Sequence, residues 1–165
     1  MIYVGVDNGL TGGIVAINNR LDVVGKWVMP IIETNKKEFD VITIQKIFDD
    51  LLKKDKKIFV ALEKAHPRPV QGTRAAFTTG FCYGMFQGIL GSKGISYDIV
   101  NPSLWMKLVF EGMNIKDKKA STIWAQRKFP KENWRATERT KIIHDGLTDA
   151  AALAYYCFLV NGGKR

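Results

Sequence analysis

The chain contains few of the residues that bind transition metals or cross-link secreted proteins. Its 165 residues include two cysteines and two histidines. Cys82 and Cys157 lie in apolar surroundings, without a Cys-x-x-Cys pair or a Cys/His cluster, so we expect both to be reduced core residues. The composition therefore argues against a zinc site and against a disulfide framework. A cytoplasmic location is expected.

Long apolar segments are also missing. No apolar run reaches the roughly 18 to 20 residues that a membrane span needs, and the N-terminal run is too short for a signal peptide and lacks a basic start. A hydrophobic fraction of 46% with 25% charged residues is typical of a soluble globular protein. The length fits one domain, which we expect to cover residues 1–165.

Acidic residues are scarce relative to basic ones. Lysine and arginine number 25 against 16 aspartates and glutamates, which gives a net charge of +9 and an isoelectric point near 9.6. Such an excess favours a polyanionic partner such as nucleic acid. A small protein can also be basic merely for solubility, and charge alone leaves both interpretations open.

The hydrophobic pattern predicts alternating strands and helices. Strands are expected over residues 2–6, 12–18, 22–28, 58–62 and 95–100. Helices are expected over residues 37–54, 72–92, 101–109, 115–129 and 144–160. Short turns join the first three strands, so they should form an antiparallel meander. The order predicts an α/β fold whose five-stranded mixed sheet has three antiparallel strands, then two parallel ones, flanked by helices.

Four carboxylates have an unusual setting in this pattern. Asp7 and Glu63 end predicted strands, while Asp145 and Asp149 lie four residues apart on one face of the last predicted helix. Each acid alone has an ordinary explanation, such as a turn, an ion pair or the helix dipole. Together they would meet at one edge of the sheet and repel one another unless a cation bound them. Oxygen ligands of this kind suit Mg²⁺ or Mn²⁺.

Three segments resemble the motifs of a known family. "GVDNG" (5–9), "VALEKAHPRPVQG" (60–72) and "HDGLTDAAALA" (144–154) are similar, in that order, to motifs of RuvC-type Holliday junction resolvases, members of the RNase H-like superfamily. "VNPSLWMKLV" (100–109) and "KDKKASTIWAQRKFP" (116–130) resemble segments of the phage-type members. One departure concerns the last acids, which are commonly three apart in the family. Here Gly146 occupies the position three residues before Asp149, and the acid Asp145 lies four residues before it. His144, next to Asp145, is then a further candidate ligand or base.

The resemblance implies an RNase H-like fold and a structure-selective endodeoxyribonuclease. Such an enzyme binds four-way DNA junctions as a homodimer and hydrolyses two phosphodiesters. It implies two Mg²⁺ ions per active site, with Mn²⁺ as a substitute, held by Asp7, Glu63, Asp145 and Asp149. It also implies a protein encoded by a phage and acting in the bacterial host cell.

Basic and aromatic residues near these motifs are candidates for DNA contact. The resemblance makes Lys118 or Lys119 a candidate for neutralising the scissile phosphate. Lys116 lies beside them before a predicted helix, where an ordinary solvated lysine face is the alternative. In the loop and helix after Glu63, the candidates for the junction centre in the resolvase interpretation are His66, Arg68, Arg74 and Phe77, with core packing as the alternative for Phe77. Trp134 is most simply a core or edge residue, and its basic loop makes DNA contact the alternative.

The glycine-bearing segment 77–91 is a candidate dimer helix. A stripe of Phe81, Met85 and Ile89 is expected to be exposed there and to require a partner. An ordinary core helix is the alternative for this segment.

Three other functions are alternatives to a junction resolvase. Another RNase H-like nuclease would act on flaps or RNA/DNA hybrids. An actin-like ATPase is suggested by "GVDNGLTGG" (5–13), which also resembles a phosphate loop, although 165 residues leave no room for the second domain of that fold. A non-catalytic junction-binding protein is disfavoured because acids near phosphates weaken DNA binding.

Overall fold

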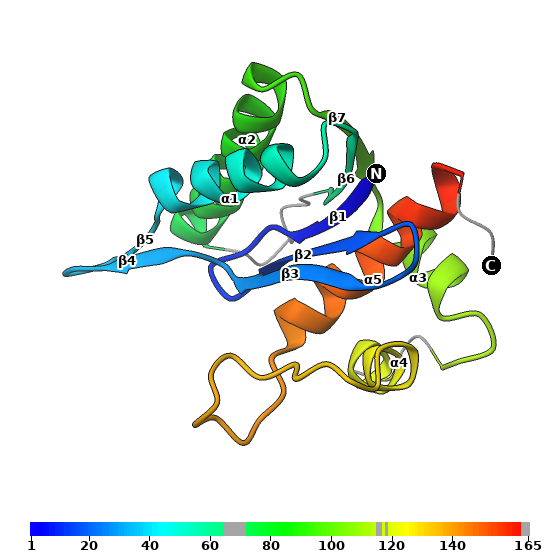
Figure 1. The fold of residues 1–165 in the computed structure, drawn as a ribbon. Coiled ribbons are helices and arrows are strands. Elements are labelled where there is room, and N and C mark those ends of the chain that lie inside the picture. Colours follow the sequence, from blue (N-terminus) through cyan, green and yellow to red (C-terminus); the bar gives the residue numbers. More distant parts are fainter. Residues whose placement is uncertain (65–71, 115–116, 118, 163–165) are drawn as a thin grey trace.

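A five-stranded mixed sheet forms the centre of the molecule (Figure 1). The computed structural model describes residues 1–64, 72–114, 117 and 119–162. The strands are β1 (Ile2–Asp7), β2 (Gly13–Asn18), β3 (Val23–Val28), β6 (Ile58–Glu63) and β7 (Ser96–Val100), and their spatial order is β3-β2-β1-β6-β7. The first three pair antiparallel, and β6 and β7 add in parallel beside β1. The predicted sheet is confirmed.

A two-stranded hairpin replaces the start of the first predicted helix. β4 (Ile31–Glu33) pairs antiparallel with β5 (Lys37–Phe39), and α1 covers only Val41–Lys54. The prediction of helix from residue 37 was therefore wrong. Asp40 marks the helix start because its carboxylate accepts hydrogen bonds from the Thr43 amide (3.0 Å) and hydroxyl (2.7 Å). The hairpin projects from the sheet in Figure 1.

Helices cover both faces of the sheet (Figure 1). α1 and α2 (Thr73–Ser92) pack on one face, and α3 (Pro102–Val109), α4 (Ala120–Lys128) and α5 (Asp145–Val160) pack on the other. α5 lies directly against β1 at Gly5, where an added methyl group would be 2.0 Å from the Ala150 carbonyl oxygen. Only glycine allows this close approach.

The other four predicted helices are confirmed, and among them α4 starts later than predicted. α4 begins at Ala120 rather than at residue 115, because the Asp117 carboxylate accepts a hydrogen bond from the Lys119 amide (2.9 Å) in the turn before it. Ile115, expected on the inner face of this helix, lies outside the described residues. Within the described part of the chain, no helix has both the length and the apolar character required to cross a membrane.

Alternation along the strands divides the core into two clusters. On β1, the side chains of Val4 and Val6 join the cluster under α1 and α2, and Tyr3 joins the cluster around α5. Cys82 and Cys157 are buried free thiols, as predicted. Trp134 is 2% exposed and packs against Phe129 with the ring centroids 5.9 Å apart, so its core packing is confirmed and the alternative of a DNA contact was wrong.

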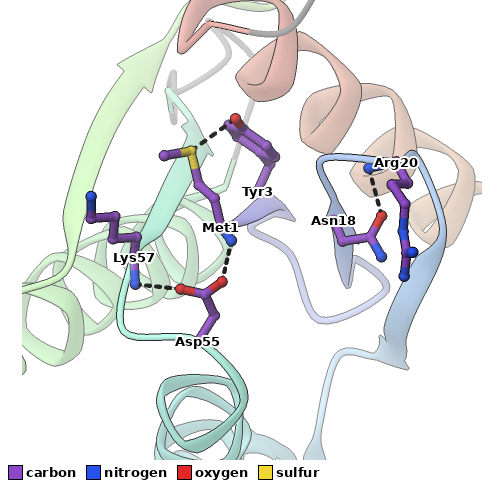
Figure 2. Close-up of polar contacts among 6 residues, drawn as sticks. All are labelled: Met1, Tyr3, Asn18, Arg20, Asp55 and Lys57. Atoms are coloured by element: carbon purple, nitrogen blue, oxygen red, sulfur yellow. Dashed lines mark hydrogen bonds and ion pairs between the residues drawn. The ribbon is translucent and has the colours of Figure 1, made fainter.

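Polar contacts anchor the two chain segments that flank the first hairpin (Figure 2). The N-terminal amino group of Met1 pairs with Asp55, whose carboxylate also accepts from the Lys57 amide at 2.9 Å. These contacts join the start of β1 to the end of α1. In the turn between β2 and β3, the Asn18 side-chain oxygen accepts from the Arg20 amide at 2.8 Å. The first strand is therefore fixed at its N-terminal end, and its C-terminal end carries Asp7.

Candidate active site

Three of the four predicted acids meet at one edge of the sheet. Asp7 ends β1 and Glu63 ends β6, and the two strands are parallel neighbours with Val6 opposite Leu62. Both acids therefore lie at the same edge. Asp149 lies in the second turn of α5, which packs across β1. The pKa values of Asp7 and Glu63 are both raised by the charge of Asp149, so the three carboxylates lie within electrostatic range of one another.

Burial and mutual repulsion perturb these carboxyl groups. Burial, and then the charge of Asp149, raises the pKa of Asp7 to about 7. Burial, and then the charges of Asp7 and Asp149, raises the pKa of Glu63 to about 8. Burial also raises the pKa of Asp149, against a lowering by its hydrogen bond from Ser121. Among the ion pairs of the described residues, none includes these acids.

Asp145 and His144 lie at the rim of this group. Asp145 is exposed in the first turn of α5, and its charge contributes to the raised pKa of Asp149. His144 caps α5: its Nδ1 accepts a hydrogen bond from the Leu147 amide at 3.3 Å, which leaves Nε2 as the nitrogen that can take another partner. Burial lowers the pKa of His144, so the neutral ring is favoured.

The acids have the chemistry of a metal site without its closed geometry. Oxygen donors with unbalanced negative charge suit Mg²⁺ and Mn²⁺. In the described segments, however, no three aspartate, glutamate, histidine or cysteine side chains are grouped closely enough to hold a metal ion as they stand. The arrangement is therefore a set of convergent carboxylates that would have to close around a cation.

Comparison with known proteins adds evidence about the fold. No family model and no curated protein matches the sequence. Among solved structures, T. thermophilus RuvC in complex with a Holliday junction substrate is similar with a TM-score of 0.65 and 15% identity, over 98% of this chain and 96% of that one. The chain has the RuvC fold. A second Thermus thermophilus RuvC structure matches with a TM-score of 0.58 and 19% identity, over 94% of this chain and 92% of that one.

A eukaryotic structure shares the same fold. The yeast mitochondrial Holliday junction resolvase Ydc2 matches with a TM-score of 0.58 and 14% identity, over 93% of this chain and 75% of that one. The RuvC fold thus extends over nearly the whole chain, as the sequence motifs predict.

Within this RuvC fold, packing explains why glycine precedes Asp149 by three residues. A methyl group added at Gly146 would lie 2.4 Å from the Thr11 carbonyl oxygen and 2.7 Å from Cα of Gly12. The first turn of α5 rests directly on the turn between β1 and β2. No acidic side chain fits at position 146, and the nearest acid is Asp145.

Ser121 is a member of the site that sequence reasoning missed. It lies in the first turn of α4, is 7% exposed, and its hydroxyl hydrogen-bonds to the Asp149 carboxylate. Thr148, which is fully buried, donates to Ser121 at 3.2 Å and to the Asp145 carbonyl oxygen at 2.9 Å. A serine near a helix start ordinarily indicates capping, so the sequence contained no separate signal for this role.

The predicted DNA-contact residues fall into two groups. Lys119 is exposed immediately before α4, and Arg74 and Phe77 are exposed in the first turns of α2, with Phe77 at 74%. The remaining ones lie outside the described residues: His66, Arg68, Lys116 and Lys118.

The expected exposed stripe on α2 was partly wrong. Phe81 is 49% exposed, but Ile89 is buried and Met85 packs against the core. The outer face consists instead of Phe77 with a row of glycines at helical spacing: Gly80, Gly84, Gly88 and Gly91. A methyl group added at any of these four glycines would meet nothing within 4 Å.

Proposed function

We propose that the chain is a metal-dependent endonuclease that resolves four-way DNA junctions by paired phosphodiester hydrolysis. The observation that carries the proposal is the convergence of Asp7, Glu63 and Asp149 from three separate elements, with raised pKa values and no balancing cation among the described residues. The similarity of the fold to RuvC with its Holliday junction substrate supports this choice of substrate. The net charge of +9 suits a polyanion.

The carboxylates would hold two Mg²⁺ ions, with Mn²⁺ as a substitute. Asp7, Glu63 and Asp149 are the inner ligands in this proposal, and Asp145 or His144 completes the set from the rim. Bound ions supply a more acidic attacking water and neutralise charge on the phosphate and the leaving oxygen. Ser121 orients the Asp149 carboxylate, and Lys119 or Lys118 contributes positive charge to the scissile phosphate.

We further propose that the enzyme is a homodimer whose subunits meet through α2. From Ala75 to Ser92 the helix contains no charged residue, although its outer face is solvent-accessible. The four outer glycines allow the backbone of another helix to approach closely, and Phe77 beside them provides exposed apolar surface. A second copy of the chain offers the same uncharged face, which makes an isologous contact self-complementary.

The proposed dimer would bring together the residues assigned to the junction centre. Arg74 and Phe77 belong to the start of α2. In the proposal they face the unpaired centre of the junction together with His66 and Arg68, which precede α2 in the sequence, and Lys116 is a further DNA contact. Flat and cationic side chains suit unstacked bases and closely spaced phosphates.

A cleavage assay tests the proposed function and its alternatives. The substrates are immobile and mobile four-way junctions, a flap, duplex DNA and an RNA/DNA hybrid, each with Mg²⁺, Mn²⁺ or EDTA. We expect paired nicks in the junctions and none in EDTA. Equal cutting of the hybrid and the junction would instead identify a different RNase H-like nuclease. Junction binding without cleavage would support the non-catalytic alternative, and ATP turnover would support the actin-like one.

Asp7→Asn is the variant that tests the proposed metal site in the same cleavage assay. It should abolish cleavage and retain junction binding, because it removes a metal ligand and one negative charge near the phosphate. The control is Asp50→Asn on the exposed side of α1, where Asp50 pairs only with Lys53 at 2.7 Å among the ion pairs of the described residues. Normal cleavage by Asp7→Asn would refute the metal-site assignment.

A further inference from the structure

A groove extends from the edge of the candidate active site to the β4–β5 hairpin. It has a volume of about 1050 Å³ and lies between that hairpin and the first half of α2. One end is formed by Asn8, Gly9 and Leu10, which directly follow Asp7 in the chain. Pockets for single small molecules hold roughly 300–1,000 Å³, so this groove has room for an extended ligand. A strand that passes the carboxylates can continue into it.

The walls of the groove offer flat aromatic surface. Phe81 of α2 is 49% exposed and stacks on the buried Phe39 of β5, with the centroids 6.1 Å apart and the planes at 27°. Phe77 lines the same groove one turn earlier and is 74% exposed. Two exposed phenylalanines in one groove form a contiguous apolar patch of the kind that marks a binding site, and bases stack on such rings whatever their sequence.

The rim of the groove is positively charged. Lys36 and Lys37 from the hairpin and Arg74 from α2 line it, with Glu38 as the acid among its lining residues. Lys37 pairs with Glu33 at 3.0 Å, so its charge is partly balanced. The groove therefore combines aromatic faces with an excess of cations, which matches a nucleic acid strand and not a basic or purely apolar partner.

We infer that this groove binds unpaired nucleotides of the DNA strand that enters the active site, with a base against Phe81 and a phosphate at Lys36. The hairpin is then a DNA-binding element that extends the contact beyond the start of α2. The inference rests on the proposed function for the choice of DNA as ligand. Binding in the groove requires neither metal nor cleavage, so the two can be tested separately.

The test measures binding of single-stranded DNA to the full chain in EDTA. The probe is a fluorescein-labelled oligothymidylate of about eight nucleotides, and a second oligonucleotide carries 2-aminopurine, whose fluorescence is quenched by stacking. Phe81→Ala should weaken binding about tenfold and reduce the quenching. Phe81→Tyr should retain both because it keeps the ring. Lys36→Gln should reduce the slope of log affinity against log salt concentration by about one, which corresponds to the loss of one phosphate contact.

Leu104→Ala on α3 is the matched control, because Leu104 is 57% exposed on a helix of the other face. Equal losses in Phe81→Ala and Leu104→Ala, unchanged binding by Phe81→Ala, or no single-strand binding by the unmodified chain would each overturn the inference. A chain that binds the strand at Phe81 but cuts no junction would support the groove and refute the proposed function. Junction cutting with normal strand binding by Phe81→Ala would refute the groove alone.

Discussion

Asp7, Glu63 and Asp149 are single residues whose charge opposes the fold that positions them. Burial raises the pKa of all three, and the charge of a neighbouring acid raises each pKa further. A protein retains such an arrangement at the cost of stability when the residues serve binding or catalysis. Substitution of these residues should therefore raise the stability of the metal-free protein and lower its activity.

Asp7→Asn should stabilise the metal-free protein at pH 8. The change removes one of three repelling carboxylates, and we expect a gain of about 1–2 kcal/mol in the free energy of unfolding. Denaturant unfolding in EDTA measures it. Asp50→Asn, at an exposed ion pair, should leave the free energy of unfolding nearly unchanged. A destabilised Asp7→Asn would show that the carboxylate makes a favourable contact in the folded chain.

Ser121→Ala tests the positioning of Asp149. Loss of the hydroxyl leaves the Asp149 carboxylate without this donor, while Thr148 keeps its bond to the Asp145 carbonyl oxygen. Mn²⁺ affinity, measured by calorimetry, should fall about tenfold, as for other residues that orient metal ligands. The exposed Ser103→Ala on α3 is the control. Unchanged affinity in Ser121→Ala would leave Ser121 with a packing role only.

At the scale of elements, two features have surfaces that the core does not use. The β4–β5 hairpin projects beyond the main sheet, and α2 turns a glycine face to solvent opposite its buried residues Cys82, Phe86 and Leu90. α5 is the contrasting case, since most of its residues are buried. The surfaces of the hairpin and of α2 are thus available for partners, whereas α5 mainly completes the core and contributes its first turns to the candidate active site.

Gly84→Arg should convert the proposed dimer into a monomer. The side chain adds bulk and charge to a face that has neither, so a second helix cannot approach. Sedimentation velocity measures the state at several concentrations. Ile42→Arg on α1 changes a residue that is 65% exposed on another helix and should leave the state unchanged. A dimer that persists in Gly84→Arg would place the interface elsewhere.

At the scale of the whole molecule, the buried acids link folding to pH and to metal. Asp7 and Glu63 retain protons in the folded chain up to about pH 7 and 8, whereas unfolded aspartate and glutamate release them near pH 4. Between about pH 4 and 8 the folded state thus binds more protons, and its stability decreases as the pH rises.

This linkage predicts a Tm that falls by several degrees between pH 5 and pH 8 in EDTA. Addition of Mg²⁺ or Mn²⁺ at pH 8 should restore part of the loss, because a ligand of the folded state alone stabilises it. Calorimetry across this range measures both effects. In Asp7→Asn the decline should be shallower. A pH-independent Tm in the unmodified chain would contradict the raised pKa values.

Most of the sheet and the positions of the acids could be predicted from the sequence. Short apolar, β-rich runs predicted five strands, and the strand ends at Asp7 and Glu63 followed from the same runs. The β4–β5 hairpin was missed because Lys37–Phe39 continues directly into an amphipathic helix, and the boundary depends on the cap at Asp40. The alternative of a DNA contact for Trp134 arose from the basic residues around it, whereas the ring itself is buried.

By itself the sequence determined the strand and helix order, the positive charge and the acids that end the strands, since these depend on local periodicity and residue type. Only the tertiary structure decided which surfaces stay open and which groups meet. Gly146 is fixed by the turn at Thr11, and Ser121 reaches Asp149 from another helix. The groove arises where the hairpin and α2 face each other. Such contacts join residues far apart in the chain, so no local pattern records them.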